Sequence, residues 1–194
     1  EGGGINFSNH TMWIENSRFE DNSSALAGGG GRGYTSTPTT IRNTSFLDNA
    51  SEVEGGGFYV ASAANLEHVI VIGNSAPTGA GLSIISSAAT LTNCTVVGNE
   101  GFGISTRNSP TLKNTVVALN EGDVDGYASG YYNLIGNKEG LSGIENVYNG
   151  NIVGAATSPI DPLFVRNPSD GGDGWGDDPA TSGVDEGANE IGRA

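Results

Sequence analysis

Five charged residues near the start of the chain have side chains suited to polysaccharide chemistry. Arg18, Glu20 and Asp48 are accompanied by Asp21 and Arg42. A polysaccharide lyase needs carboxylates that hold Ca²⁺ beside an arginine or lysine base, and a glycoside hydrolase needs convergent acids. If the fold gathers these residues, Arg18, Glu20 and Asp48 are the candidate catalytic residues. The alternative, which we favour, is an exposed patch of ion pairs without catalytic activity.

An acidic, glycine-rich stretch from Asn167 to Glu190 has the composition of a metal-binding loop. Ca²⁺ takes about six to eight oxygen ligands, and glycines let carboxylates and carbonyls converge on the ion. The stretch lacks the EF-hand spacing and the nonapeptide array of calcium-dependent β-rolls, so a solvated acidic tail is an equal alternative. A second acidic segment, Glu121–Gly126, favours a surface loop over a metal site. The candidate Ca²⁺ ligands are Asp170, Asp173, Asp177, Asp178 and Asp185.

A stripe of hydroxyl groups is suited to binding a glycan. Tyr59, Ser83 and Ser105 occupy equivalent positions in successive segments, and the stripe ends near Arg107. Tyr59, Ser83 and Arg107 are therefore the candidate ligand-binding residues. The alternative is an ordinary solvent-facing surface, where such residues are common.

The charge of the chain restricts its partners. Its 194 residues include 22 Asp or Glu against 8 Lys or Arg, a formal net charge of -14. Nucleic acid is disfavoured as a partner, because binding a polyanion requires a cationic surface. The sequence contains no apolar run long enough to span a membrane. Its single cysteine, Cys94, cannot form an internal disulfide, and we expect it to be an inert core residue.

An internal repeat indicates which elements position these side chains. Five stretches align without gaps: WIENSRFEDN, TIRNTSFLDN, NLEHVIVIGN, TLTNCTVVGN and TLKNTVVALN. Their closing residues, 27, 25, 25 and 21 positions apart, are Asn22, Asn49, Asn74, Asn99 and Asn120. Six positions before these stand Asn16, Asn43, His68, Asn93 and Asn114. His68 is therefore predicted to replace an asparagine in a column rather than to act in catalysis.

Units of this length, built from short segments with period-two alternation, predict one coil of a parallel β-helix per repeat. Leucine-rich repeats need a helix-forming half, and propeller blades are nearer twice as long. Stacked coils place equivalent residues about 4.8 Å apart, and the closing asparagines should form a hydrogen-bonded ladder at a corner with left-handed backbone. The predicted interior columns are Phe19, Phe46, Val71, Val96 and Val117, and Ile14, Ile41, Leu66, Leu91 and Leu112.

The units TLTNCTVVGNEGFGI and TIRNTSFLDNASEVEGGGFYV resemble the right-handed parallel β-helix repeats of the pectate-lyase-like superfamily. The resemblance covers about residues 1–150 and is strongest to Gly- and Asn-rich surface proteins exported by bacteria. It implies an all-β, right-handed, single-stranded parallel β-helix of about six to seven coils. It also implies an extracellular or cell-surface scaffold without catalytic activity, such as an adhesin, stalk or envelope-assembly segment, that binds glycans and is stabilised by Ca²⁺. The alternative is a polysaccharide lyase or glycoside hydrolase, or a fragment of one, because the same fold serves those enzymes.

The sequence divides into two segments. Residues 1–154 are expected to form the coils, and residues 155–194 a C-terminal capping segment with the acidic loop, truncated at Ala194. Leu163, Phe164 and Val165 are candidates to close the open end of the coils, which would otherwise expose strand edges. Open coil ends would also suit stacking of neighbouring copies into filaments.

Overall fold

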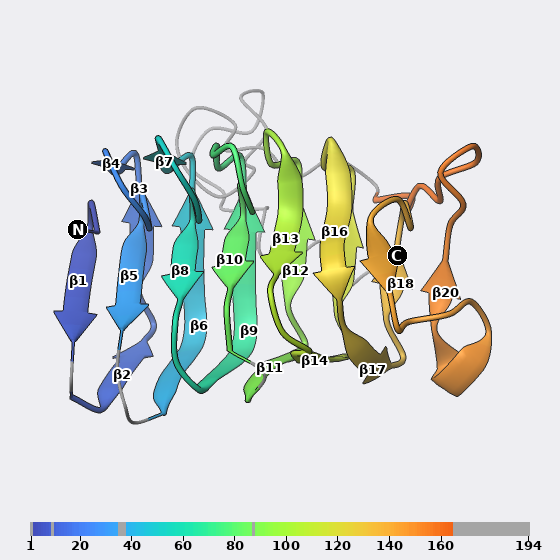
Figure 1. Cartoon of the computed structure of the whole chain (residues 1–194), viewed down its shortest axis with the longest axis horizontal. Coiled ribbons are helices and arrows are strands. Elements are labelled where there is room, and N and C mark those ends of the chain that lie inside the picture. Colours follow the sequence, from blue (N-terminus) through green and yellow to red (C-terminus); the bar gives the residue numbers. More distant parts are fainter. Residues whose placement is uncertain (1, 9, 35–37, 87, 165–194) are drawn as a thin grey trace, which may run out of the picture. The chain divides into compact units, whose positions relative to one another are not determined.

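A computed structural model describes residues 2–8, 10–34, 38–86 and 88–164. The chain divides into two compact units, Glu1–Ile160 and Asp161–Ala194. In the first unit the strands follow one another around successive coils, and equivalent strands of neighbouring coils pair in parallel (Figure 1). The predicted parallel β-helix is confirmed.

Three parallel sheets run along the first unit in its described residues. The seven-stranded sheet has the order β1 (Ile5–Ser8), β5 (Gly31–Tyr34), β8 (Phe58–Val60), β10 (Leu82–Ile84), β13 (Phe102–Thr106), β16 (Gly122–Tyr127) and β19 (Leu141–Ser142). The eleven-stranded sheet contains β2 (Met12–Glu15), β3 (Arg18–Glu20), β6 (Thr39–Leu47), β9 (Ala64–Ile72), β11 (Ala89–Thr92), β12 (Thr95–Val97), β14 (Thr111–Lys113), β15 (Val116–Ala118), β17 (Ser129–Tyr131), β18 (Leu134–Ile135) and β20 (Ile152–Val153). A short sheet pairs β4 (Ser23–Ser24) with β7 (Ala50–Ser51), and a 3₁₀ turn, η1 (Tyr148–Gly150), precedes β20.

The eleven-stranded sheet bends along a column of residues with left-handed backbone. β6 and β9 pass through this bend at Asn43 and His68, where φ is 45° and 53°. In the other coils the bend separates two short strands, as Asn93 with φ of 54° separates β11 from β12. Asparagine is frequent here because it tolerates this conformation better than most other residues that carry a Cβ atom.

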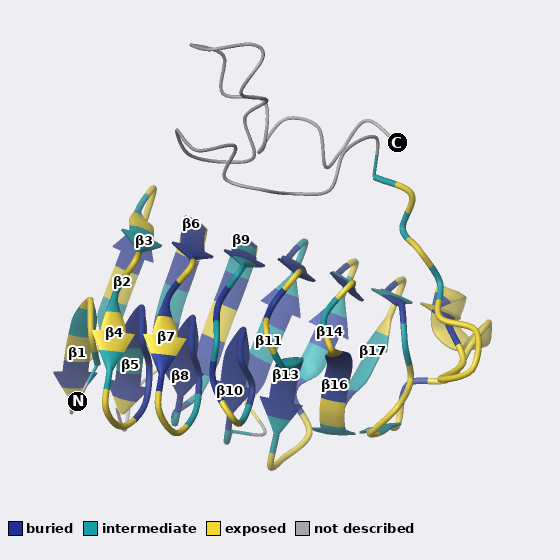
Figure 2. Ribbon diagram, turned by 90° about the horizontal axis from the view of Figure 1, so that it is seen from above, coloured by how far each residue is buried: buried dark blue, intermediate teal, exposed yellow. Residues whose placement is uncertain are grey.

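Both predicted apolar columns are present and in register. Phe19 pairs with Phe46, which continues through Val71 and Val96 to Val117. The second column runs from Ile14 through Ile41, Leu66 and Leu91 to Leu112. Most of these side chains are fully buried, and strands β8 and β10 appear dark blue in Figure 2 because all their residues are buried. Each coil therefore covers the interior of the next.

The closing asparagines form the predicted ladder. The Nδ2 of Asn49 donates to the Oδ1 of Asn74 at 3.0 Å, and the Nδ2 of Asn74 donates to Asn99 at 3.0 Å. The backbone N–H of each of these residues donates to the same oxygen, so one amide carbonyl accepts two bonds from the coil before it. Asn22 and Asn120 extend the ladder at its two ends.

The left-handed backbone at this corner belongs to a different residue from the one expected. The position directly before the closing asparagine has a positive φ: 53° at Asp21, 50° at Asp48 and 60° at Leu119, with glycines at 73 and 98. The asparagine itself must point its amide into the core, whereas the preceding residue turns the chain.

One glycine after the corner is required by a close contact rather than by its backbone φ angle, because a Cβ on Gly103 would lie 2.6 Å from the Nδ2 of Asn120.

A carboxylate ends the ladder. The Nδ2 of Asn120 donates to the Oδ1 of Asp123 at 3.0 Å, and the backbone N–H of Asn137 donates to its Oδ2. Asp123 is 1% exposed. Within the ladder each side-chain amide donates to the next one toward the C-terminal end, and the two oxygens of Asp123 accept from the last amide and from the backbone of Asn137.

The last coils are less regular. Ile152 and Val153 of β20 pair with β18, the N–H of Ile160 donates to the carbonyl of Gly136, and a short antiparallel bridge joins Ala155 and Ser158. Of the residues expected to close the coil end, Leu163 is 73% exposed and Val165 lies outside the described residues.

Replacing a central member of the ladder should destabilise the fold. Asn74→Ala removes bonds to Asn99, to the carbonyls of Phe46 and Ile72, and from Asn49, all in the interior. We expect the free energy of unfolding to fall by about 3 kcal/mol, because buried polar groups lose their partners. The exposed Asn65→Ala should change it by about 0.5 kcal/mol or less. Urea denaturation followed by circular dichroism would measure both, and equal losses would contradict a special role for the ladder.

The contribution of Asp123 should depend on pH. Burial raises the pKa of its carboxyl, and hydrogen bonds from Asn120, Asn137 and Gly136 offset part of that rise. A folded-state pKa above the unfolded value means that the folded chain binds the proton more tightly, so stability falls as pH rises through the folded-state pKa. We expect the difference in unfolding free energy between wild type and the non-titrating Asp123→Asn to decrease over that range. Urea denaturation at a series of pH values tests this, and a difference that grows with pH would show a lowered pKa instead.

Candidate functional site

Half of the eleven-stranded sheet presents a regular polar surface, which we call the polar face. Its strands are β2, the first parts of β6 and β9, then β11, β14 and β17, whose apolar residues alternate inward. The outward residues therefore form two columns in register. The first column is Trp13, Thr40, Asn65, Thr90, Thr111 and Ser129, and the second is Glu15, Arg42, Glu67, Thr92, Lys113 and Tyr131.

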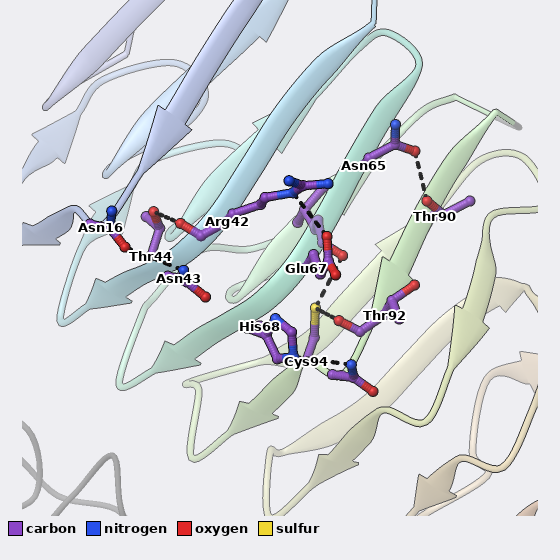
Figure 3. Close-up of polar contacts among 12 residues, drawn as sticks. Asn16, Arg42, Asn43, Thr44, Asn65, Glu67, His68, Thr90, Thr92 and Cys94 are labelled. Atoms are coloured by element: carbon purple, nitrogen blue, oxygen red, sulfur yellow. Dashed lines mark hydrogen bonds and ion pairs between the residues drawn. The ribbon is translucent and has the colours of Figure 1, made fainter.

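Side chains of the polar face contact one another between coils. The Nε of Arg42 lies 2.9 Å from the Oε2 of Glu67, and the Oγ1 of Thr90 donates to the Oδ1 of Asn65 at 2.9 Å (Figure 3). The guanidinium of Arg42 also lies 5.5 Å from the ring centre of Trp13. These contacts fix the rotamers of a surface that solvent reaches.

Aromatic side chains stand at the two ends of the polar face. Trp13 in the first coil is 59% exposed, and Tyr131 on β17 is 41% exposed. The ammonium group of Lys113 lies 5.7 Å from the ring centre of Tyr131. This contact resembles the one between Arg42 and Trp13 at the other end of the face. Tyr132 packs edge-on against Tyr131 with ring centres 5.7 Å apart. Each exposed ring is thus held by a neighbouring side chain.

The seven-stranded sheet carries a different outward row, which we call the hydroxyl row: Arg32, Tyr59, Ser83, Ser105 and Asp125. Ser83 donates to the Oε2 of Glu54 at 2.9 Å, and the Nη2 of Arg107 contacts the same oxygen at 3.0 Å. Ser105 donates to the Oδ2 of Asp125 at 3.1 Å. The structure thus brings the three candidate ligand-binding residues, Tyr59, Ser83 and Arg107, into one region around Glu54.

Glu54 was missing from the sequence-based set because it lies in the turn after β7, outside the aligned strands. The hydroxyl row is largely enclosed: Tyr59 is 6% and Ser83 2% exposed. Burial and the nearby Glu54 carboxylate raise the pKa of Tyr59. The guanidinium of Arg32 lies 5.4 Å from the ring centre of Tyr59, and its Nε is buried without a hydrogen-bond partner. Most polar groups of this row therefore already serve the protein itself.

A comparison with family models decides the family. Residues 1–121 match the model described as "Right handed beta helix region", which is more than half of the chain. The chain belongs to the right-handed β-helix family. No curated protein and no solved structure shows a significant match to it. The family fixes the coil architecture and its hand, while the function has to be argued from the outward residues.

In this β-helix the candidate catalytic residues lie on different parts of the first two coils. Arg18 and Glu20 form an ion pair within β3, and Asp48 occupies the left-handed position before Asn49. The carboxylate of Glu20 is not repeated along the axis. The equivalent positions in the next coils are Leu47, Ile72, Val97 and Ala118.

The expected calcium ligands lie outside the described residues; they are Asp170, Asp173, Asp177, Asp178 and Asp185. Within residues 2–164, apart from the gaps at 9, 35–37 and 87, no three His, Cys, Asp or Glu side chains gather as a metal-binding group. In the same part of the chain, no helix is long and apolar enough to cross a membrane.

His68 and Cys94 take the structural places expected of them. The Nε2 of His68 lies 3.1 Å from the Nδ2 of Asn93, while Asn43 donates to Asn16 in the same column (Figure 3). Cys94 is 2% exposed, and its thiol contacts the carbonyls of Leu66 and Thr92. Burial raises the pKa of the Cys94 thiol to about 12.

Cys94 should be unreactive in the folded β-helix. A thiol with a pKa of about 12 is almost entirely protonated at neutral pH, and the thiolate is the reactive form. We expect iodoacetamide to label the native protein far more slowly than the urea-unfolded protein. Intact-mass spectrometry would follow the labelling. Labelling of the native chain at the rate of a free thiol would contradict this placement.

Proposed function

We propose that the protein is a non-catalytic β-helix scaffold of the extracellular space or the bacterial cell surface, and that it binds glycans. The observation that carries the proposal is the unbroken register of the polar face from β2 to β17. A surface of this kind offers hydrogen-bonding groups at fixed intervals on a rigid support, and an extended polymer of sugar units can use such a surface along its length.

The environment of the carboxylates favours a scaffold over an enzyme. A general acid or nucleophile of a glycosidase must be available to the sugar, and two such groups must face each other. Glu20, Glu54 and Glu67 instead pair with Arg18, Arg107 and Arg42. Glu54 also accepts a bond from Ser83 on the oxygen that contacts Arg107. Carboxylates paired in this way are typical of structural ion pairs, which orient the side chains of a surface.

Two further parts of the proposal concern the rest of the scaffold. Ca²⁺ bound by the aspartates between Asp170 and Asp185 would stabilise the acidic segment, since carboxylate oxygens are ligands that the ion prefers and glycines let the chain bring them together. Neighbouring copies would associate through coil ends, because unpaired edges of parallel strands tend to pair with further strands. A net charge of -14 suits a hydrated surface protein.

The test is whether the protein binds glycans without changing them. We expect retention on at least one member of a panel of neutral and acidic polysaccharides in affinity electrophoresis. We expect no new reducing ends and no ultraviolet absorbance from unsaturated uronate, with Ca²⁺ present or chelated. Turnover that is lost in Glu20→Ala or Asp48→Ala would establish a hydrolase or lyase instead, and absence of retention on every glycan would remove the binding proposal.

A further inference from the structure

We infer that the polar face binds a neutral, extended polysaccharide lying along the helix axis, with Trp13 and Tyr131 as its aromatic ends. The inference rests on the proposed function, because it names the ligand class and the surface for a glycan-binding scaffold. Four properties of the face support it: its spacing, its charge, its free hydrogen-bonding groups and its exposed aromatic rings.

The spacing of the face suits a linear polymer. Neighbouring strands of a sheet lie about 4.8 Å apart, which is close to the length of one hexose unit in an extended glycan. Trp13 on β2 and Tyr131 on β17 stand on the first and last of six paired strands, so five strand spacings place the rings about 24 Å apart along the axis. A chain of five or six sugars can therefore meet one row of side chains per unit and reach both rings.

The charge of the face selects a neutral polymer. Its charged side chains are Arg42 and Lys113 against Glu15 and Glu67, which balance. Arg42 is neutralised by Glu67 at 2.9 Å. The rest of the chain is strongly acidic, with a formal charge of -14 overall, so a polyanionic glycan would be repelled. A neutral glycan avoids that repulsion and needs only hydrogen bonds and ring contacts.

The face also has unused hydrogen-bonding groups, which the hydroxyl row lacks. Asn65 accepts from Thr90 through Oδ1, which leaves its exposed Nδ2 group free to donate. The hydroxyls of Thr40 and Thr92 make no side-chain hydrogen bond within the described residues. By contrast, Ser83 and Ser105 are buried and already donate to carboxylates. Sugar hydroxyls can therefore find partners on the polar face without breaking existing bonds.

The aromatic rings supply the remaining contact. Sugar rings bury their C–H faces against aromatic side chains, as apolar area does at protein interfaces. The charged groups of Arg42 and Lys113 lie over the rings of Trp13 and Tyr131 from the neighbouring coil, and this contact reduces the conformational freedom that the rings lose when a ligand binds. Exposed rings at both ends, with polar side chains between them, suit a ligand that spans the whole face.

The experiment measures binding of the full chain to cellohexaose, xylohexaose and mannohexaose, to the matching disaccharides, and to polygalacturonate. We expect at least one neutral hexasaccharide to bind, and its disaccharide to bind much more weakly. Trp13→Ala and Tyr131→Ala should each weaken that binding roughly tenfold, and Trp13→Phe should retain most of it. The matched control is Tyr148→Ala, which removes a ring that is 66% exposed on η1 and should leave binding unchanged.

The other outcomes separate this inference from the proposed function. Binding that depends on Arg107 rather than on Trp13 and Tyr131, or that is confined to polygalacturonate, would overturn the polar face as the site but keep a glycan-binding scaffold. Absence of binding to every glycan would overturn both. A dimer in sedimentation that Trp13→Ala dissociates would identify the face as a contact between copies and overturn the inference. Circular dichroism spectra and urea midpoints must match wild type for each variant.

Discussion

The structure depends on residues of the same type standing directly above one another in successive coils. The closing asparagines show how strict this is, because the carbonyl of Asn74 accepts both the backbone and the side-chain N–H of Asn49. A coil displaced by one residue would break both bonds and turn its apolar column outward. Buried amides therefore fix the register, while the aliphatic and phenylalanine columns provide most of the burial.

The amide ladders have a direction, and the two ladders run oppositely. Along the closing column the bonds between side chains all run toward the C-terminal coils, from each Nδ2 to the next Oδ1, and the buried Asp123 accepts at the end. At the outer bend, Asn43 donates to Asn16 and Asn114 donates to Asn93, toward the N-terminal coils. The closing column ends on the carboxyl of Asp123, whereas the outer column ends on the amide of Asn16, so the direction of donation alone does not decide which acceptor stands last.

The repeat made most of the fold predictable from sequence, since stacking requires similar residues at regular intervals. The interior columns, the closing ladder and His68 as a member of the outer column followed from that regularity. Glu54 did not, because it reaches Ser83 and Arg107 across 29 and 53 residues from a turn of variable length. The left-handed corner was misplaced by one residue, since aspartate, glycine and leucine share that position and leave no single-residue signal. The polar face was also missed, because its outward residues vary in type while their spacing stays constant.

The inward residues of each strand specify the fold, and the outward residues are free to vary. The same fold can therefore carry a function that its interior does not specify. Stacking constrains the residue type at Leu66 and Leu91, which face the interior. The neighbouring Asn65 and Thr90 face outward, where any polar side chain is compatible with the fold. Two outward faces of one solenoid have consequently taken different forms: the hydroxyl row is closed by Glu54 and Arg107, and the polar face stays open between Trp13 and Tyr131. Side chains that already hydrogen-bond to one another must break those bonds to bind a ligand, so such a surface contributes little binding free energy. The face with free donors on a fixed spacing therefore has more to gain from binding a polymer.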